Sequence, residues 1–254
     1  MVETRRSFHQ QLDEVRDEIV RLAGIVTENI ARGTQALLDG DLDAAEGIIE
    51  GDDELDSMTL EIEDRCCQLL ALQQPMAVDL RTIVTDLRMV AEIERSGDLV
   101  VNMMKGARRL YGTALDPKVR GLITRLGEQV QRIFRLAIDA YIDRNDGLAA
   151  ALDDMDDIVD ELQGDFIQAV FESHATGNVE LKAAVQLALV GRYYERIADH
   201  AVNIGERVRY MVTGWLPEHT GAVRHAVRMS GGPSSSGQAG TDASNAADTH
   251  GGDG

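Results

Sequence analysis

Apolar residues recur every three or four positions over most of the chain, and this spacing places side chains on one face of an α-helix. The clearest stripe consists of Leu187, Val190, Tyr194, Ile197, Ala201, Ile204 and Val208. Its alternating steps of three and four are typical of a helical-bundle core. Glycine and proline punctuate the pattern and end the helices. The pattern predicts six long helices, over residues 8–39, 41–72, 76–111, 117–143, 148–174 and 179–212.

The sequence also repeats itself once. Acidic positions match at an offset of 104 residues before the loop around residues 73–77, in the pairs Asp39/Asp143, Asp52/Asp156 and Asp56/Asp160. After this loop the offset is 101 residues, in the pairs Glu94/Glu195, Asp98/Asp199 and Asn102/Asn203. An internal repeat of this kind predicts two tandem units of one architecture. We therefore expect an all-α protein with two three-helix bundles, over residues 1–114 and 115–218.

The last part of the chain has a different composition. Residues 231–254 contain no Leu, Ile, Val or aromatic residue. Such a segment cannot bury enough apolar surface to offset the entropy of ordering it. We expect most of residues 219–254 to form a disordered, low-complexity tail.

The net charge of the chain disfavours some classes of binding partner. The 254 residues have a formal net charge of −19, which repels nucleic-acid phosphates and anionic lipid headgroups, although acidity is equally well explained by solubility. No apolar run approaches the ~20 residues of a membrane span, and the first residues lack the apolar core of a signal peptide. We expect a cytoplasmic protein with no nucleic-acid partner and no direct membrane insertion.

Each repeat carries two acidic pairs spaced four residues apart, so that both carboxylates of a pair share one helix face. The eight residues are Asp52, Asp56, Glu94, Asp98, Asp156, Asp160, Glu195 and Asp199. Like charges at this spacing cost an isolated helix about 0.2–0.5 kcal/mol. Each pair lies roughly 30 Å from the turn between the second and third predicted helices of its repeat, at 1.5 Å per residue. The sequence thus predicts four carboxylates at one height in each bundle.

Four neighbouring carboxylates require a cation or raised pKa values. Oxygen ligands favour hard ions such as Mg²⁺, Mn²⁺, Ca²⁺ or iron. The acidic columns lie away from the apolar stripe, which predicts a metal site on the bundle surface. Asn102 and Asn203, one turn further along, are candidates to support the ligands or are simply polar surface residues. The alternative is a solvated acidic face that Arg95 and Arg196 help to neutralise.

Catalytic chemistry has little support in the sequence. No glycine-rich phosphate loop, Ser-His-Asp arrangement or Cys-His pair is present. A ferritin-type di-iron site requires a His three residues after a Glu, and no His here follows a Glu at that distance. We therefore predict that the protein is not an enzyme. A metal-free helical scaffold and a carboxylate-bridged metalloenzyme remain as alternatives.

The doubled Glu-Arg-x-x-Asp-x-x-x-Asn face, Asp79-Leu80-Arg81 and the duplicated three-helix layout resemble the PhoU family over roughly residues 8–216. The resemblance implies surface clusters of Fe, Mn, Mg or Zn on the acidic pairs, and often a homodimer. It also implies a negative regulator of phosphate uptake and of the phosphate-starvation response. Such a protein contacts the ATPase subunit of a phosphate ABC transporter and a sensor histidine kinase of a two-component system, at the inner face of the membrane.

Overall fold

The structure, a computed structural model, describes residues 2–73 and 75–215. Within these residues the chain forms eight helices and no strand: α1 (Val2–Asp39), α2 (Leu42–Glu50), α3 (Asp52–Gln73), α4 (Val78–Leu110), α5 (Pro117–Asp143), α6 (Asp146–Ala150), α7 (Leu152–Ala175) and α8 (Leu181–Thr213). None of these helices has an apolar stretch long enough to cross a bilayer. The prediction of a disordered tail over residues 219–254 lies outside the described residues.

The all-α prediction is confirmed, with six long helices and two short ones, α2 and α6. The sequence predicted single helices over 41–72 and 148–174, and the structure divides each of them. The breaks fall at Gly51 (φ −73°, ψ −7°) and Ala151 (φ −77°, ψ −8°), whose backbones stay close to helical. Apolar residues are buried on both sides of the first break, at Ile48 and Leu55. The apolar pattern therefore runs through a kink that it does not reveal.

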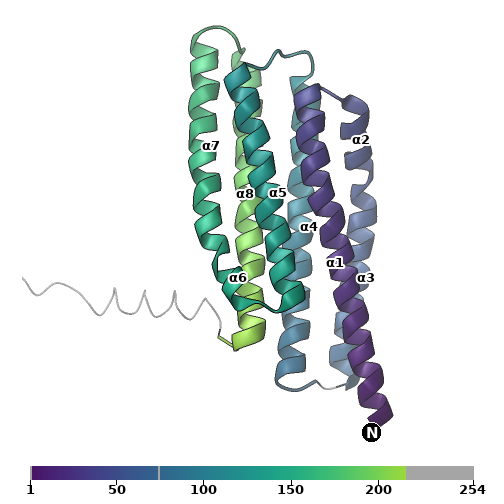
Figure 1. Ribbon diagram of the computed structural model, residues 1–254. Helices are drawn as coiled ribbons and strands as arrows, with labels where there is room; N and C mark the ends of the chain where they lie inside the picture. The colour runs from purple at the N-terminus through teal and green to yellow at the C-terminus, as the bar shows by residue number, and fades with distance from the viewer. Residues whose placement is uncertain (1, 74, 216–254) are drawn as a thin grey trace, which may run out of the picture. The chain divides into compact units, whose positions relative to one another are not determined.

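The two repeats have the same layout and pack against each other. Helices α1–α4 form the first repeat and α5–α8 the second (Figure 1). The α3–α4 turn and the α7–α8 turn lie at opposite ends of the bundle (Figure 1). Helix α4 packs along α8, and α1 packs along α5. Helices α4 and α8, the last of each repeat, are therefore central: they pack against each other and also against helices of their own repeats.

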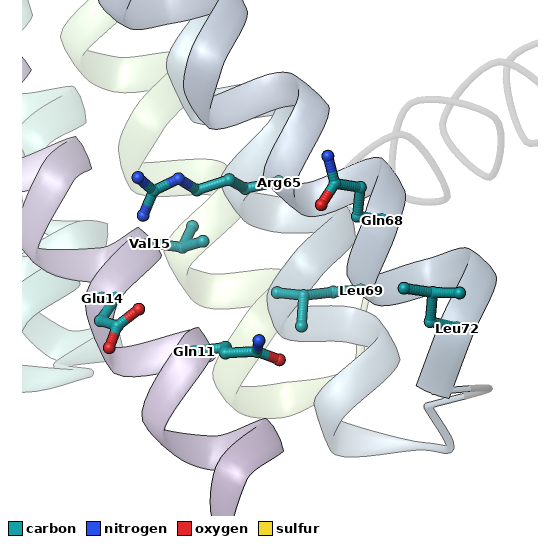
Figure 2. Close-up of a pocket in the computed structure, with 7 residues that line it drawn as sticks. All are labelled: Gln11, Glu14, Val15, Arg65, Gln68, Leu69 and Leu72. Carbon is teal, nitrogen blue, oxygen red and sulfur yellow. The ribbon is translucent and has the colours of Figure 1, made fainter.

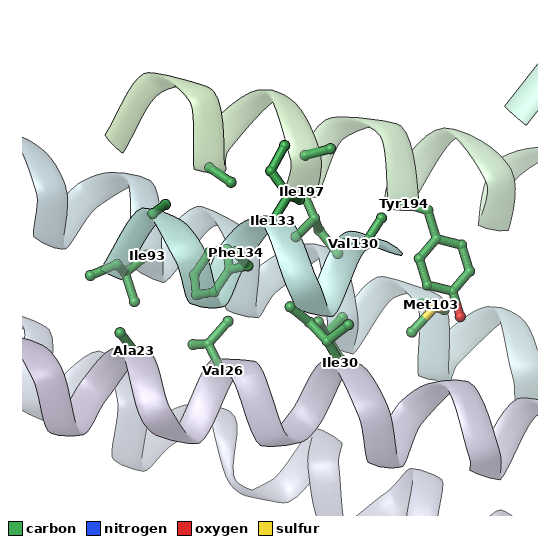
Figure 3. Packing of buried hydrophobic residues seen from close by; sticks show 14 of the residues in the cluster. Ala23, Val26, Ile30, Ile93, Met103, Val130, Ile133, Phe134, Tyr194 and Ile197 are labelled. Atoms are coloured by element: carbon green, nitrogen blue, oxygen red, sulfur yellow. The ribbon is translucent and has the colours of Figure 1, made fainter. Parts of the chain in front are cut away.

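One hydrophobic core serves both repeats. Figure 3 shows Val26 and Ile30 of α1 facing Ile133 and Phe134 of α5, with Ile197 of α8 on the other side of α5. All five side chains are fully buried. All the described residues belong to one compact unit. The predicted boundary at residue 114 thus separates two repeats of the sequence. The hydrophobic core is continuous across it.

Candidate functional site

The second repeat brings its two acidic pairs to facing sides of adjacent helices. Asp156 and Asp160 lie near the beginning of α7, and Glu195 and Asp199 lie in the middle of α8. The two helices approach closely one turn away, because a Cβ built on Gly191 would lie only 2.8 Å from Cδ1 of Phe166. We call these four residues, Asp156, Asp160, Glu195 and Asp199, the second carboxylate site.

The other three carboxylates of this site act on Asp156. Burial, followed by the charges of Asp160 and Asp199, raises the pKa of Asp156 to about 6. The charges of Asp157 and Glu195 add to the same effect. A raised pKa from neighbouring carboxylates means that the ionised cluster carries a cost that a cation can relieve. The predicted meeting of α7 and α8 carboxylates therefore exists as an electrostatic cluster.

Two oxygens of this site are buried without a hydrogen-bond partner, Oδ1 of Asp156 and Oε2 of Glu195. The other oxygen of Glu195 accepts a hydrogen bond from Arg192, and Asp199 Oδ2 lies 3.9 Å from Nε of Arg196. Buried polar atoms are almost always satisfied, so each exception needs an explanation. Asp156, Glu195 and Asp199 are half-buried and Asp160 is exposed, so the site is less open to solvent than the sequence indicated.

The first repeat has an equivalent cluster, which we call the first carboxylate site: Asp52 and Asp56 of α3 with Glu94 and Asp98 of α4. Burial, and then the charge of Asp98, raises the pKa of Asp52. Burial, and then again the charge of Asp98, raises the pKa of Glu94. Lys105 opposes the shift at Asp52, so the first site has a neutralising cation within its reach.

Neither cluster is a preformed metal centre. No group of three or more His, Cys, Asp or Glu side chains within the described residues is arranged to hold a metal ion. The residue types nevertheless suit a hard cation, and the two orphaned oxygens of the second carboxylate site fit such a guest. Metal binding by the eight predicted residues stays a prediction.

The two asparagines have different surroundings. Asn102 is exposed on α4. Asn203 is half-buried on α8, and its Nδ2 donates to Oε2 of Glu92 at 3.0 Å. Its amide is thus committed to a carboxylate of the other repeat, outside both carboxylate sites.

The sequence did not single out Glu92, which forms a buried polar contact between the repeats. Its Oε2 accepts from Nδ1 of His200 at 2.6 Å as well as from Asn203. Burial raises the pKa of Glu92, but the hydrogen bonds from His200 and Asn203 outweigh it and hold the pKa below its ordinary value. The repeat itself contains a signal, since Tyr193 stands at the position matching Glu92 and Leu99 at the one matching His200.

Five pockets formed by the described residues contain no residue of either carboxylate site. One, of about 370 Å³, opens between α1 and α3 and is lined by Gln11, Glu14, Val15, Arg65, Gln68, Leu69 and Leu72 (Figure 2). Arg65 Nη1 pairs with Glu18 Oε1 at 2.8 Å. This mixture of apolar, amide and paired charged groups offers no arrangement for catalysis or for a specific ion.

Comparison with known sequences gives the family. The PhoU domain model matches twice, at residues 19–107 and 123–208. The chain is 35% identical to the "phosphate-specific transport system accessory protein PhoU homolog 1" of Mycobacterium leprae, over 84% of this chain and 96% of that protein. It is 33% identical to the corresponding homolog of Clostridium acetobutylicum, over 83% of this chain and 96% of that protein.

Comparison with solved structures agrees. The crystal structure of PhoU from Pseudomonas aeruginosa superposes with a TM-score of 0.77 at 29% identity, over 82% of this chain and all of that one. The regulatory protein PhoU from Streptococcus pneumoniae, at 24% identity, shares the fold with a TM-score of 0.76, over 82% of this chain and 98% of that one. The matched repeats, the sequence identity and the shared architecture show that this chain belongs to the PhoU family.

Proposed function

We propose that this chain is an accessory protein of a phosphate-specific transport system and represses phosphate uptake when phosphate is plentiful. The observation that carries the proposal is the identity of 34–35% to mycobacterial proteins named as accessories of that system, over 84% of this chain. Those relatives align over 96–100% of their own length. The proposal therefore draws on whole relatives and does not depend on a shared fragment.

The chain acts by contact and not by turnover. Its partners are the ATPase subunit of the phosphate ABC transporter and a sensor histidine kinase, which place it in the cytoplasm at the inner face of the membrane, with a homodimer as its working form. A single core that spans both repeats makes a stiff scaffold, and docking costs less free energy on a surface that does not rearrange. The fold supports this role by holding two acidic clusters and a large helical surface in fixed relation.

The second carboxylate site holds a divalent or iron-type cation in this proposal. A bound cation supplies positive charge that relieves the repulsion among the carboxylates. Oδ1 of Asp156 and Oε2 of Glu195 are the ligands that the structure favours, because both are buried and unpartnered. Asp160 and Asp199 lie beside them and complete an oxygen-only donor set.

Gene deletion tests the regulatory role. A strain that lacks the gene is grown at high phosphate, and phosphate uptake and starvation-gene expression are measured. We expect constitutive expression and unrestrained uptake, both restored by the wild-type gene. Normal repression in the deletion strain would contradict the proposal.

The metal is tested separately on purified protein by comparing wild type with a Glu195→Ala, Asp199→Ala double variant. Metal content is measured by elemental analysis after loading with iron or manganese, and partner binding is measured in the same samples. Loss of metal and weaker docking support the cation site. Unchanged metal content and unchanged docking reject it and leave a metal-free scaffold.

A further inference from the structure

Two stretches of the central helices are basic and contain no acidic residue. Residues 99–110 of α4 include Lys105, Arg108 and Arg109, and residues 181–192 of α8 include Lys182 and Arg192. Neither stretch contains Asp or Glu, in a chain with 44 acidic and 25 basic residues. This local excess of positive charge is opposite in sign to the net charge of −19.

The two stretches lie side by side and run antiparallel. Nη1 of Arg109 donates to Oε1 of Gln186 at 3.3 Å. A Cβ built on Gly106 would lie 3.6 Å from Cγ2 of Val190. Residue numbers thus fall along α4 as they rise along α8, so Arg109 of α4 lies beside the basic stretch of α8.

An apolar row runs along the same part of α8. Leu181 is 64% exposed, Val185 50% and Leu189 40%. They are spaced four residues apart, so they line up on one helix face over about 12 Å. Exposed apolar residues are normal when scattered, whereas a contiguous row indicates an interaction site. We call Leu181, Val185, Leu189, Arg109 and Lys182 the basic–apolar face.

The charges at this face are incompletely neutralised by the protein itself. Arg108 pairs with Glu46 at 2.9 Å, and Arg192 donates to Glu195. Within residues 2–73 and 75–215, no carboxylate forms an ion pair with Arg109 or Lys182, and the side-chain partner of Arg109 is the neutral Gln186. Two cations beside an exposed apolar row therefore remain available to a partner.

We propose that the basic–apolar face binds an acidic amphipathic helix of a partner protein. Apolar side chains of that helix, at spacings of three and four, pack between Leu181, Val185 and Leu189, as ridges of one helix fit the grooves of another. Its carboxylates lie against Arg109 and Lys182. The inference extends the proposed function by naming a surface through which the chain contacts a partner. It rests on the proposed function only in that both treat the chain as a docking protein.

Charge and size favour a protein helix over other occupants. A nucleic acid or an anionic membrane needs a broad positive surface, and the second carboxylate site borders this face one turn beyond Arg192. A helix that crosses α8 at this row, about 10 Å wide, needs only a short basic surface. The strongly acidic remainder of the chain also opposes an extended anionic surface more than it opposes one short segment.

The test uses the full-length protein and two synthetic helical peptides of about three heptads. Both peptides have Leu at the inward positions, with Glu at the outward positions of one and Lys at those of the other. Binding is measured by fluorescence anisotropy near 0.15 M salt, where distant charges are screened. One double variant, Val185→Ser with Leu189→Ser, removes the apolar row, and another, Arg109→Glu with Lys182→Glu, reverses the charge.

Matched controls change equivalent residues elsewhere. Leu60 of α3 is 65% exposed, so Leu60→Ser removes an exposed leucine outside the face. Arg132→Glu reverses an exposed charge on α5. Circular dichroism confirms that every variant is folded before binding is measured.

We expect the wild type to prefer the Glu peptide and the serine double variant to bind it about tenfold more weakly. The charge-reversed variant should prefer the Lys peptide, while both controls behave as wild type. Equal binding of the two peptides, or an equal loss in Leu60→Ser, would overturn the proposal. Self-association of the wild type, or its binding to anionic vesicles, would also overturn the proposal if the serine double variant abolished it. Phosphate repression is not a readout here, so failure leaves the proposed function standing.

Discussion

Nδ1 of His200 lies 2.6 Å from Oε2 of Glu92, and this buried contact joins α8 of the second repeat to α4 of the first. Asn203 donates to the same oxygen at 3.0 Å, and Nη1 of Arg95 lies 3.5 Å from the other oxygen. A carboxylate that is nine-tenths covered thus has donors from both repeats. The contact fixes the register between the two central helices.

His200→Ala should lower the free energy of unfolding by about 3 kcal/mol at pH 7, because it leaves a buried carboxylate with one donor fewer. Urea denaturation measures the change. The pKa of Glu92 is held below its ordinary value of 4.5, so its contribution is present above that pH and is lost as the pH falls through the lowered value. The difference between variant and wild type should therefore shrink in acid. A difference that is constant with pH would show that packing alone is lost.

Asp86→Asn should stabilise the protein at alkaline pH. Asp86 is fully buried and accepts from the hydroxyl of Tyr141 at 2.7 Å. Burial raises its pKa to about 7, against the opposing effects of Tyr141, Arg144 and Arg16. The folded state therefore holds this proton more tightly than the unfolded state, and stability falls as the pH rises through 7.

Asparagine keeps the acceptor for Tyr141 and removes the buried charge. The gain should be on the order of 3 kcal/mol at pH 8 and should vanish near pH 4, where the aspartate is protonated in the folded protein. Chemical denaturation of both proteins at the two pH values measures it. A variant that is less stable than wild type at pH 8 would mean that the unpaired amide costs more than the charge.

Asp156→Asn should have opposite effects with and without a divalent ion. Without added metal it removes one charge from a repulsive cluster and should stabilise by up to about 1 kcal/mol, a gain limited by solvent screening. With Mn²⁺, the Tm of the wild type should rise and that of the variant should not. Asp157→Asn is the matched control, since Asp157 is an exposed neighbour outside the site. An equal loss of the Mn²⁺ effect in the control would point to general charge screening.

Gly127→Ala should destabilise the protein by about 2 kcal/mol. A Cβ there would lie 2.5 Å from Oγ1 of Thr34, and that hydroxyl bonds to the buried Tyr194 hydroxyl at 2.7 Å. Gly24→Ala, also within a helix but with nothing within 4 Å of a new Cβ, should instead stabilise by up to about 1 kcal/mol. Thermal denaturation separates the two. Thr34→Ala should restore part of the loss in Gly127→Ala, because it removes the two atoms 2.5 Å from the new Cβ while Cβ of residue 34 stays 3.0 Å away. Equal changes in Tm for Gly127→Ala and Gly24→Ala would show that helix propensity alone determines the change in stability.

The sequence was sufficient for the parts of the fold that depend on helix periodicity and punctuation. The six long helices and the acidic clusters follow from spacings of three and four and from counting residues back to a turn. The kinks at Gly51 and Ala151 did not follow, because the apolar stripe continues through them. A break that leaves the backbone nearly helical hardly changes which residues face the core.

The contact of Glu92 with His200 could not be read from periodicity, because it depends on how α4 and α8 of different repeats are aligned. The sequence of either helix alone does not determine their relative register. The burial of Oδ1 of Asp156 and Oε2 of Glu195 was missed for a related reason. The helical wheel places both residues off the core stripe, but it does not contain the neighbouring helix that covers them.

The continuous core makes each repeat dependent on the other. The pairing of α4 with α8 and of α1 with α5 buries surfaces that a lone repeat would leave in water. The two halves produced as separate polypeptides should therefore associate through these faces. Because both halves belong to one polypeptide, matched positions can carry different residues, and Glu92 faces His200 without a mirror copy of that pair.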